Sequence, residues 1–160
     1  MNLLIIGSGA REHSFVWKIF NSKHDIKIFA TNPNAGISKI SICVDVDIND
    51  FVSIKKLIIN HSIDIVLIGP EIPLINGITD FINNDSDLQD VNVIGPSQKG
   101  SMLEGSKEFA KNFMAKYNIP TASYKSFDKS TFDQALSFIN KNTPPYVLKA
   151  DGPAAGKGVI

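Results

Sequence analysis

The chain has 160 residues, and 16 Lys and Arg balance 16 Asp and Glu, so its formal net charge is zero. Hydrophobic residues make up 43% and charged residues 20%, which is typical of a folded domain and argues against intrinsic disorder. Without a basic excess there is no electrostatic case for nucleic-acid binding, and no apolar run reaches the roughly 18 residues of a membrane span. The N-terminus lacks a signal-peptide pattern, and the single cysteine, Cys43, excludes an internal disulfide. We expect a soluble, cytoplasmic protein with no nucleic-acid or membrane partner.

The first hundred residues alternate between short apolar runs and amphipathic stretches. The apolar runs predict strands at 3–6, 26–30, 42–44, 65–68 and 91–94. Helices are predicted between them, from about His13 to Phe20, from an Asn49 cap to His61, and from Leu74 to Ile82. Strands that alternate with helices predict a Rossmann-like, doubly wound parallel sheet. Trp17 and Phe20 lie at helical spacing and are expected in the core.

The pattern changes after residue 100. One helix is predicted over 101–117, a strand over 123–127, a helix capped by Asp128 or Ser130, and a strand over 146–150. A glycine-rich segment follows over 151–158, and the last two residues, Val159 and Ile160, are typical of the start of a second strand that would pair with 146–150. Because a two-stranded hairpin needs a longer partner, we expect the chain to be the front part of a longer protein.

The segment 7–13, Gly-Ser-Gly-Ala-Arg-Glu-His, lies between the first strand and the first helix, where free N–H groups can bind an anion. It does not fit a dinucleotide site, because Glu12 replaces the third glycine and Thr31 stands where a ribose-binding acid is expected. Arg11 could hold a phosphate by two parallel hydrogen bonds, or form a solvated surface pair with Glu12. His13 is expected to be a core histidine rather than a catalytic one.

Two further loops, 32–36 and 69–74, also follow predicted parallel strands. Ligands of open α/β sheets bind at the carboxyl ends of the strands, where these loops and the first one converge. Each loop alone is an ordinary turn. Together, with Arg11 and Glu71 among their residues, they predict a pocket for a small charged molecule.

The last candidate is the glycine-rich segment 151–158. A Walker loop needs four residues between its glycines and a Ser or Thr after the lysine, whereas this segment has three and then Gly158. Between two predicted strands it is instead typical of a flap that closes over a triphosphate, with Lys157 on it. Lys149, at the end of a strand expected to be buried, needs an anionic partner, either a ligand or a structural carboxylate.

Taken together, these segments resemble the N-terminal part of the phosphoribosylamine–glycine ligase family, ATP-grasp enzymes of purine synthesis. The resemblance covers essentially the whole chain and depends on five segments in order: 7–13, 34–36, 69–74, 103–107 and 149–159. It implies a Rossmann-like substrate-binding domain over 1–100, followed over 101–160 by the incomplete start of an ATP-grasp domain.

The resemblance implies a ligase in which ATP phosphorylates the glycine carboxylate and the amine of 5-phosphoribosylamine attacks the glycyl phosphate. The products are glycinamide ribonucleotide, ADP and phosphate. The implied substrate-binding residues are Gly7, Gly9, Arg11, Glu12, Asn34, Gly36, Gly69, Pro70 and Glu71. The implied ATP-binding residues are Lys107, Lys149, Gly152, Ala155, Gly156, Lys157 and Gly158. Catalytic residues are not assigned.

The resemblance also implies Mg²⁺ or Mn²⁺, with metal ligands beyond residue 160, so we expect the 160-residue chain alone to be inactive. We expect the complete protein to be a monomer. Pro153 departs from the family, which usually has Leu there, and a stiffer flap should close more slowly or more loosely. The alternatives are another ATP-grasp carboxylate–amine ligase, a non-catalytic sugar-phosphate-binding module and, least favoured, a nicotinamide-dependent oxidoreductase.

Overall fold

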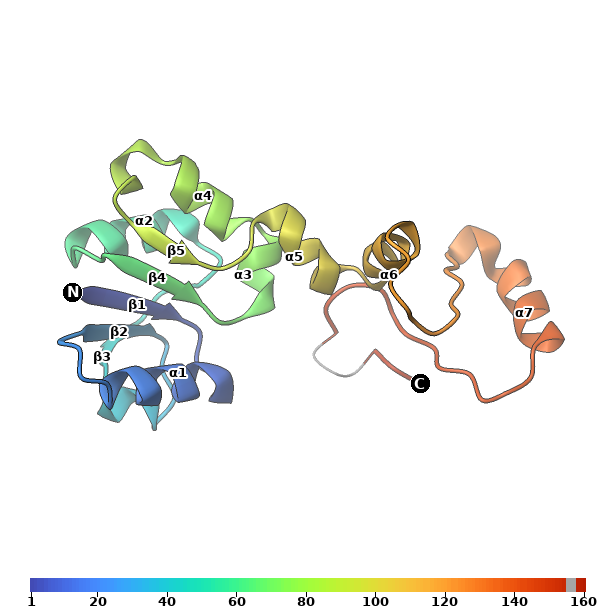
Figure 1. Ribbon diagram of the computed structural model, residues 1–160, viewed down its shortest axis with the longest axis horizontal. Helices are drawn as coiled ribbons and strands as arrows, with labels where there is room; N and C mark the ends of the chain where they lie inside the picture. Colours follow the sequence, from blue (N-terminus) through green and yellow to red (C-terminus); the bar gives the residue numbers. More distant parts are fainter. Residues whose placement is uncertain (155–157) are drawn as a thin grey trace. The chain divides into compact units, whose positions relative to one another are not determined.

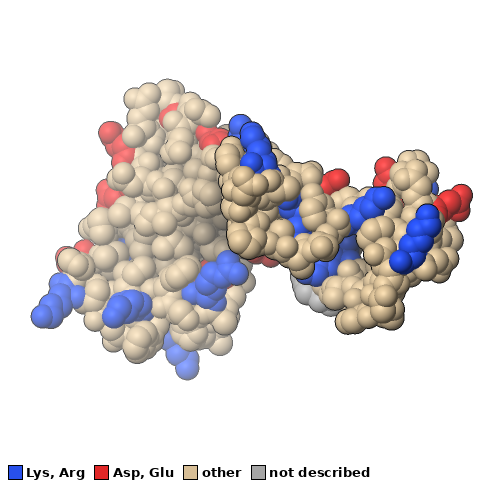
Figure 2. Space-filling model, turned by 45° about the vertical axis from the view of Figure 1, so that its right-hand side comes forward, with Lys and Arg blue, Asp and Glu red and all other residues tan. Residues whose placement is uncertain are grey.

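The computed structural model describes residues 1–154 and 158–160 (Figure 1). The chain divides into two compact units, Met1–Ser101 and Met102–Ile160, and each is described by itself. Within the described residues, no helix combines the length and the apolar character needed to cross a bilayer. On the face drawn in Figure 2, Lys and Arg side chains are dispersed among uncharged surface rather than gathered into one patch.

The first unit, described in full, contains a five-stranded parallel sheet in the order β3-β2-β1-β4-β5. Its strands are β1 (Asn2–Ile6), β2 (Lys27–Thr31), β3 (Ile42–Val44), β4 (Ile65–Ile68) and β5 (Asn92–Ile94). The chain runs outward from β1 to β3 and then returns to the other side of β1 as β4. The predicted doubly wound sheet is confirmed, and its topological switch point lies between β1 and β4.

Helices cover both faces of this sheet (Figure 1). They are α1 (Ala10–Phe20), η1 (Ile37–Lys39), α2 (Phe51–Asn60), α3 (Glu71–Ile75), α4 (Ile78–Asn84) and η2 (Ser86–Leu88). A further helix, α5 (Gln98–Gly105), follows β5 and includes Ser101, where the first unit ends. Alternate residues of β1 point to opposite faces: Leu4 and Ile6 pack with α2 and α4, and Leu3 and Ile5 pack with α1 and η1. Both faces of the sheet are therefore buried around its central strands, which explains the apolar runs of β1, β2 and β4, whereas the edge strands β3 and β5 are largely exposed.

Two expectations for α1 and α2 are wrong in detail. Trp17 and Phe20 are 58% and 57% exposed, because the buried face of α1 runs through Glu12 and Val16. A shift of one residue turns a side chain by about 100° around the helix, enough to move Trp17 from core to solvent. The cap of α2 is Asp50, whose carboxylate accepts a hydrogen bond from the Ser53 N–H, and not Asn49.

The single helix predicted over 74–82 is two short ones, α3 and α4. They are separated at Gly77, whose φ of +93° is a conformation that glycine adopts without strain. α3 begins at Glu71, so only Gly69 and Pro70 separate it from the end of β4 at Ile68.

The second unit contains α6 (Lys107–Lys116), η3 (Lys129–Thr131) and α7 (Phe132–Lys141). The helix predicted over 101–117 is divided at Ser106, which has extended dihedral angles and caps α6 with its hydroxyl. Asp128 is confirmed as the cap at the start of η3, with hydrogen bonds from Ser130 and Thr131.

The strands predicted over 123–127 and 146–150 are not formed among the described residues. Residues 148–150 instead make a single antiparallel bridge, Lys149 to Val159, with flanking backbone hydrogen bonds. A strand without a neighbour leaves its N–H and C=O groups to solvent, and this unit gives the two segments no sheet to join.

The two units differ sharply in burial. The first holds two buried apolar clusters, whereas none of the described residues from 106 to 160 is buried. Because apolar burial is the main stabilising term in folding, the second unit is held chiefly by local helical and capping hydrogen bonds.

We therefore expect hydrogen exchange to separate the units. In the 160-residue chain, amides of β1 and β4 should exchange at least about a hundredfold more slowly than amides of α6 and α7. Mass spectrometry of peptides from each unit measures this directly, and equal protection in both units would contradict it.

Candidate functional site

The turn after β1 is fixed by a buried hydrogen bond from the Gly7 N–H to the Thr31 hydroxyl, at 2.9 Å. Gly7 has a φ of +114°, and a side chain there would come within 2.9 Å of the Pro70 ring. Thr31 is fully buried at the end of β2, the position that carries an acid in dinucleotide-binding folds. Sequence reasoning treated Thr31 only as a missing acid and did not predict that it braces the glycine turn.

Glu12 is 5% exposed, and its carboxylate accepts a hydrogen bond from the Gly9 N–H at 2.6 Å. The side chain lies against Gly69, where an added Cβ would overlap the carboxylate. The hypothesis of a solvated surface pair with Arg11 is therefore wrong, since Glu12 is inside the loop cluster. Its negative charge lies at the start of α1, the position that a bound anion would otherwise favour.

Arg11 joins two loops across the switch point of the sheet. Its Nη1 donates a hydrogen bond to the Gly69 carbonyl at 2.8 Å, which links the segment after β1 to the segment after β4. A guanidinium carries five N–H donors, and this bond uses one of them. Arg11 therefore combines a structural contact with the capacity to bind an anion.

The third loop is attached to the first by Asn34. Its side-chain amide donates to the Ser8 carbonyl at 2.8 Å, while its oxygen accepts from Gly36 N–H at 2.9 Å and from Ile37 N–H at 3.0 Å. The half-buried His13 ring packs on Gly36 so closely that a Cβ there would overlap it. His13 thus packs against the third loop, but it is half-buried and not in the core as expected.

The structure thus brings together the loops that follow β1, β2 and β4. Pro70 caps α3, and Glu71 is its first residue. The predicted substrate-binding residues in or beside this cluster are Gly7, Gly9, Arg11, Glu12, Asn34, Gly36, Gly69, Pro70 and Glu71. The contacts above join the three loops, and Glu71 is placed beside them only as the first residue of α3. That these residues contact a substrate stays a prediction.

In the second unit, two of the predicted ATP-binding residues contact each other. The Lys107 ammonium donates to the Gly152 carbonyl at 2.8 Å, and Gly158 accepts from the Ala150 N–H at 2.7 Å. Lys149 is exposed, so the expectation of a buried lysine that needs an anionic partner is wrong. Ala155, Gly156 and Lys157 lie outside the described residues.

Sequence reasoning missed one residue of this region, Asp151. Its carboxylate accepts hydrogen bonds from the first turn of α6, more than 40 residues away in the sequence. Asp151 stands directly before Gly152 at the start of the glycine-rich segment, but only the structure shows what its carboxylate binds.

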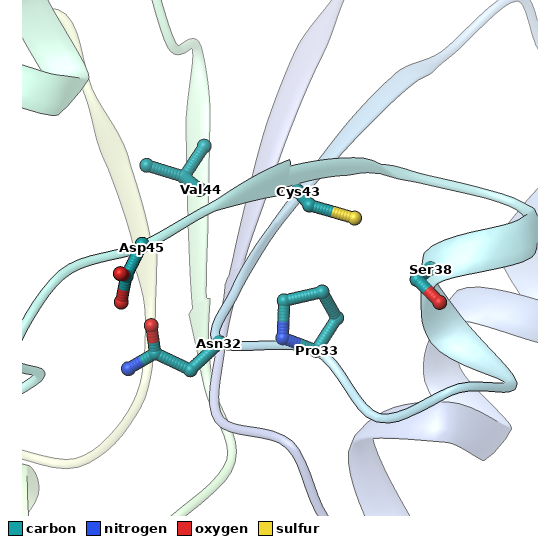
Figure 3. A pocket seen from close by; sticks show the side chains of 6 residues that line it. All are labelled: Asn32, Pro33, Ser38, Cys43, Val44 and Asp45. Carbon is teal, nitrogen blue, oxygen red and sulfur yellow. The ribbon is translucent and has the colours of Figure 1, made fainter.

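A separate open hollow of about 410 Å³ lies at the ends of β2 and β3 (Figure 3). The side chain of Asn32 makes two hydrogen bonds with the backbone of Val46: its amide donates to the carbonyl, and its oxygen accepts from the N–H. These groups of Asn32 are therefore bonded within the chain. The lining residues are Asn32, Pro33, Ser38, Cys43, Val44 and Asp45, and they include no cationic group. Within residues 1–154 and 158–160, no three His, Cys, Asp or Glu side chains gather as metal ligands would.

Comparison with known sequences identifies the family. The sequence profile of the phosphoribosylglycinamide synthetase N domain matches residues 1–104, and that of the ATP-grasp (A) domain of the same synthetase matches residues 105–160. The chain belongs to the phosphoribosylglycinamide synthetase family. The resemblance seen in the five sequence segments is confirmed.

Two curated relatives illustrate the likeness. A phosphoribosylamine–glycine ligase of Caldanaerobacter subterraneus subsp. tengcongensis is 42% identical over 160 residues, all of this chain and 37% of the relative. The bifunctional purine biosynthetic protein ADE5,7 of Saccharomyces cerevisiae is 41% identical over 167 aligned residues, which cover 100% of this chain and 20% of that protein. The chain thus spans little more than a third of the bacterial ligase.

Solved structures agree on the fold. Phosphoribosylamine–glycine ligase of Thermotoga maritima superposes with a TM-score of 0.71 at 28% identity, over all of this chain and 35% of that one. An ADP complex of the N5-carboxyaminoimidazole ribonucleotide synthetase purK gives a TM-score of 0.74 at 17% identity, over 99% of this chain and 40% of that one. At 17% identity, the likeness to the second structure concerns the fold alone.

The burial of Glu12 yields a stability prediction. Replacing Glu12 with Ala removes the acceptor of the Gly9 N–H and leaves a gap among the loops. The free energy of unfolding of the 160-residue chain should fall by about 1–3 kcal/mol. Urea denaturation followed by circular dichroism measures it, with Lys18→Ala, an exposed change on the same helix, as the control. Equal midpoints for the two variants would show that the buried carboxylate contributes nothing.

Proposed function

We propose that the complete protein joins glycine to 5-phosphoribosylamine, using ATP and giving glycinamide ribonucleotide, ADP and phosphate. The observation that carries the proposal is that both synthetase profiles match in order along the whole chain. Curated relatives at 38–42% identity bear the name phosphoribosylamine–glycine ligase. The proposal includes action in the cytoplasm on small-molecule substrates, by a monomer without nucleic-acid or membrane partners.

In this proposal, residues 1–100 form a substrate-binding domain and residues 101–160 form the start of an ATP-grasp domain. The loop cluster of the first domain would bind 5-phosphoribosylamine. Arg11 is suited to its phosphate, because a guanidinium forms short charge-assisted hydrogen bonds with phosphate oxygens. The amide and carbonyl groups of the three loops offer partners for ribose hydroxyls. Glu12 would support the site indirectly, by holding Gly9 and Gly69 in place.

The second domain would bind ATP. Lys107 and Lys149 supply positive charge for phosphate oxygens, and Gly152, Ala155, Gly156, Lys157 and Gly158 belong to the glycine-rich segment expected to cover the triphosphate. Phosphoryl transfer asks mainly for positioning and charge stabilisation, which these groups can provide. The proposal also includes Mg²⁺ or Mn²⁺, with ligands expected beyond residue 160, as the family resemblance implies.

The reaction is tested on the complete protein that begins with this chain. ADP release should require both glycine and 5-phosphoribosylamine, and the 160-residue chain alone should release none. ADP release that accepts another carboxylate or amine in their place would favour a different ATP-grasp carboxylate–amine ligase. Binding of the sugar phosphate without any turnover would favour a non-catalytic binding module.

Arg11→Ala should raise the KM for 5-phosphoribosylamine by roughly tenfold or more, because a hydrogen bond between charged groups is lost. The KM for ATP should change much less. Steady-state kinetics of the complete protein measure both, with Lys18→Ala as a control for loss of an exposed positive charge on the same helix. An unchanged KM for the sugar phosphate would remove Arg11 from the substrate site.

Pro153 gives a second kinetic prediction. Proline lacks a backbone N–H and restricts the chain at the start of the glycine-rich segment. Pro153→Leu in the complete protein should tighten ATP binding or speed turnover by about two- to fivefold, the scale of proline effects in loops. Pro120→Leu, at an exposed position outside this segment, serves as the control. If ATP affinity and turnover both stay at the wild-type values, Pro153 does not restrain the flap.

A further inference from the structure

The start of α6 is bonded to the start of the glycine-rich segment through one carboxylate. Oδ1 of Asp151 accepts from the backbone N–H of Lys107 at 2.6 Å and of Glu108 at 3.2 Å. Oδ2 accepts from the hydroxyl of Ser106 at 3.0 Å. These bonds tie together two segments 43 to 45 residues apart in the sequence.

The bonds complete the N-terminus of α6. The first N–H groups of a helix have no partner within it, and here Asp151 takes the first two. The Ser106 hydroxyl takes the third, from Phe109, and the N–H of Ser106 itself donates to the Met102 carbonyl. A nucleotide phosphate therefore finds this helix end already occupied by a carboxylate of the chain itself.

A second contact runs alongside the first. The Lys107 ammonium donates to the carbonyl of Gly152, the residue after Asp151, at 2.8 Å. Gly152 has a φ of +81°, a conformation that favours glycine. Lys107 is thus held at its backbone by Asp151 and at its side chain by Gly152.

Resting on the proposed function, we propose that Asp151 is a positioning residue of the ATP site. It does not touch the nucleotide: it fixes the start of the glycine-rich segment to α6 and so sets where the Lys107 ammonium lies. An ammonium has three N–H donors, and the Gly152 carbonyl takes one, so a phosphate oxygen can bind Lys107 without displacing that contact. Loss of Asp151 would release both segments at once.

The charge of Asp151 suits this role. Partial desolvation raises the pKa of the carboxyl, but the hydrogen bonds from the amides of α6 and from the Ser106 hydroxyl outweigh it, so the pKa lies below its ordinary value. The group is ionised at neutral pH, and its attraction to the start of the helix is fully present there.

The first experiment measures hydrogen exchange in the 160-residue chain. Asp151→Ala should speed exchange of the Lys107 and Glu108 amides by about fivefold, the scale of losing one helix cap. Asp151→Asn, which keeps an acceptor oxygen, should have a smaller effect. The control is Asp133→Ala, which removes an exposed acid from the first turn of α7 in the same unit. Unchanged exchange in Asp151→Ala would overturn the anchoring contact.

The second experiment titrates ATP into the complete protein by calorimetry. Asp151→Ala should weaken ATP binding by about five- to tenfold, Asp151→Asn by less, and Asp133→Ala not at all. The KM for glycine should stay within about twofold of wild type. Wild-type ATP affinity in Asp151→Ala, with faster exchange at α6, would show a local helix cap only and would overturn the proposal.

The two proposals fail in different ways. Without glycine-dependent ADP release the ligase function is lost, while a fall in ATP affinity on replacing Asp151 would still support the positioning role. With normal ligase activity and ATP affinity in Asp151→Ala, only the positioning role is lost.

Discussion

The buried carboxylate of Glu12 is the contact on which the candidate site of the first unit depends. It accepts a hydrogen bond from the Gly9 N–H and packs against Gly69, so it connects the loops after β1 and β4, and the hydrogen bond from Arg11 to the Gly69 carbonyl connects them a second time. Burying a carboxylate is costly unless its oxygens find donors, and the start of α1 provides one. The same residue explains why the glycine-rich turn is not a dinucleotide site, because the place of the pyrophosphate is taken.

Asp151 repeats this arrangement in the second unit. In both units a carboxylate of the chain itself lies at the start of a helix that follows or meets a glycine-rich segment. A helix N-terminus usually attracts phosphate, and here it attracts protein side chains. If phosphates are to be bound, the task falls to cationic side chains beside these carboxylates, Arg11 in one unit and Lys107 in the other. Each of these cations already donates to the carbonyl of a glycine, Gly69 and Gly152 respectively, which limits where its remaining donors point.

The sequence was sufficient for the centre of the sheet because β1, β2 and β4 are largely buried apolar runs, which stand out in the sequence without knowledge of their partners. Prediction from the sequence was wrong or incomplete where the structure of a segment depends on contacts with distant parts of the chain. The segment 146–150 has strand-like residues but forms only the bridge at Lys149, because a strand exists only with a neighbour. Thr31 and Asp151 could not be predicted as braces, since their partners lie 24 and more than 40 residues away and a hydroxyl or carboxylate has many possible acceptor roles. Trp17 was predicted in the core, but the buried residue of α1 is its neighbour Val16. Hydrophobic spacing alone does not distinguish two adjacent apolar residues.

The contrast in burial bears on how the second unit could bind a nucleotide. With none of its described residues from 106 onward buried, its geometry depends on hydrogen bonds exposed to water, each of which contributes little. The hydrogen bond from the Lys107 N–H to the Asp151 carboxylate therefore contributes little to the free energy of folding. Its main effect is to select one arrangement of α6 and the residues around Asp151 among several of similar energy. A ligand that contacts Lys107 and the glycine-rich segment together would favour that arrangement and gain affinity from it, because part of the ordering is already achieved before binding.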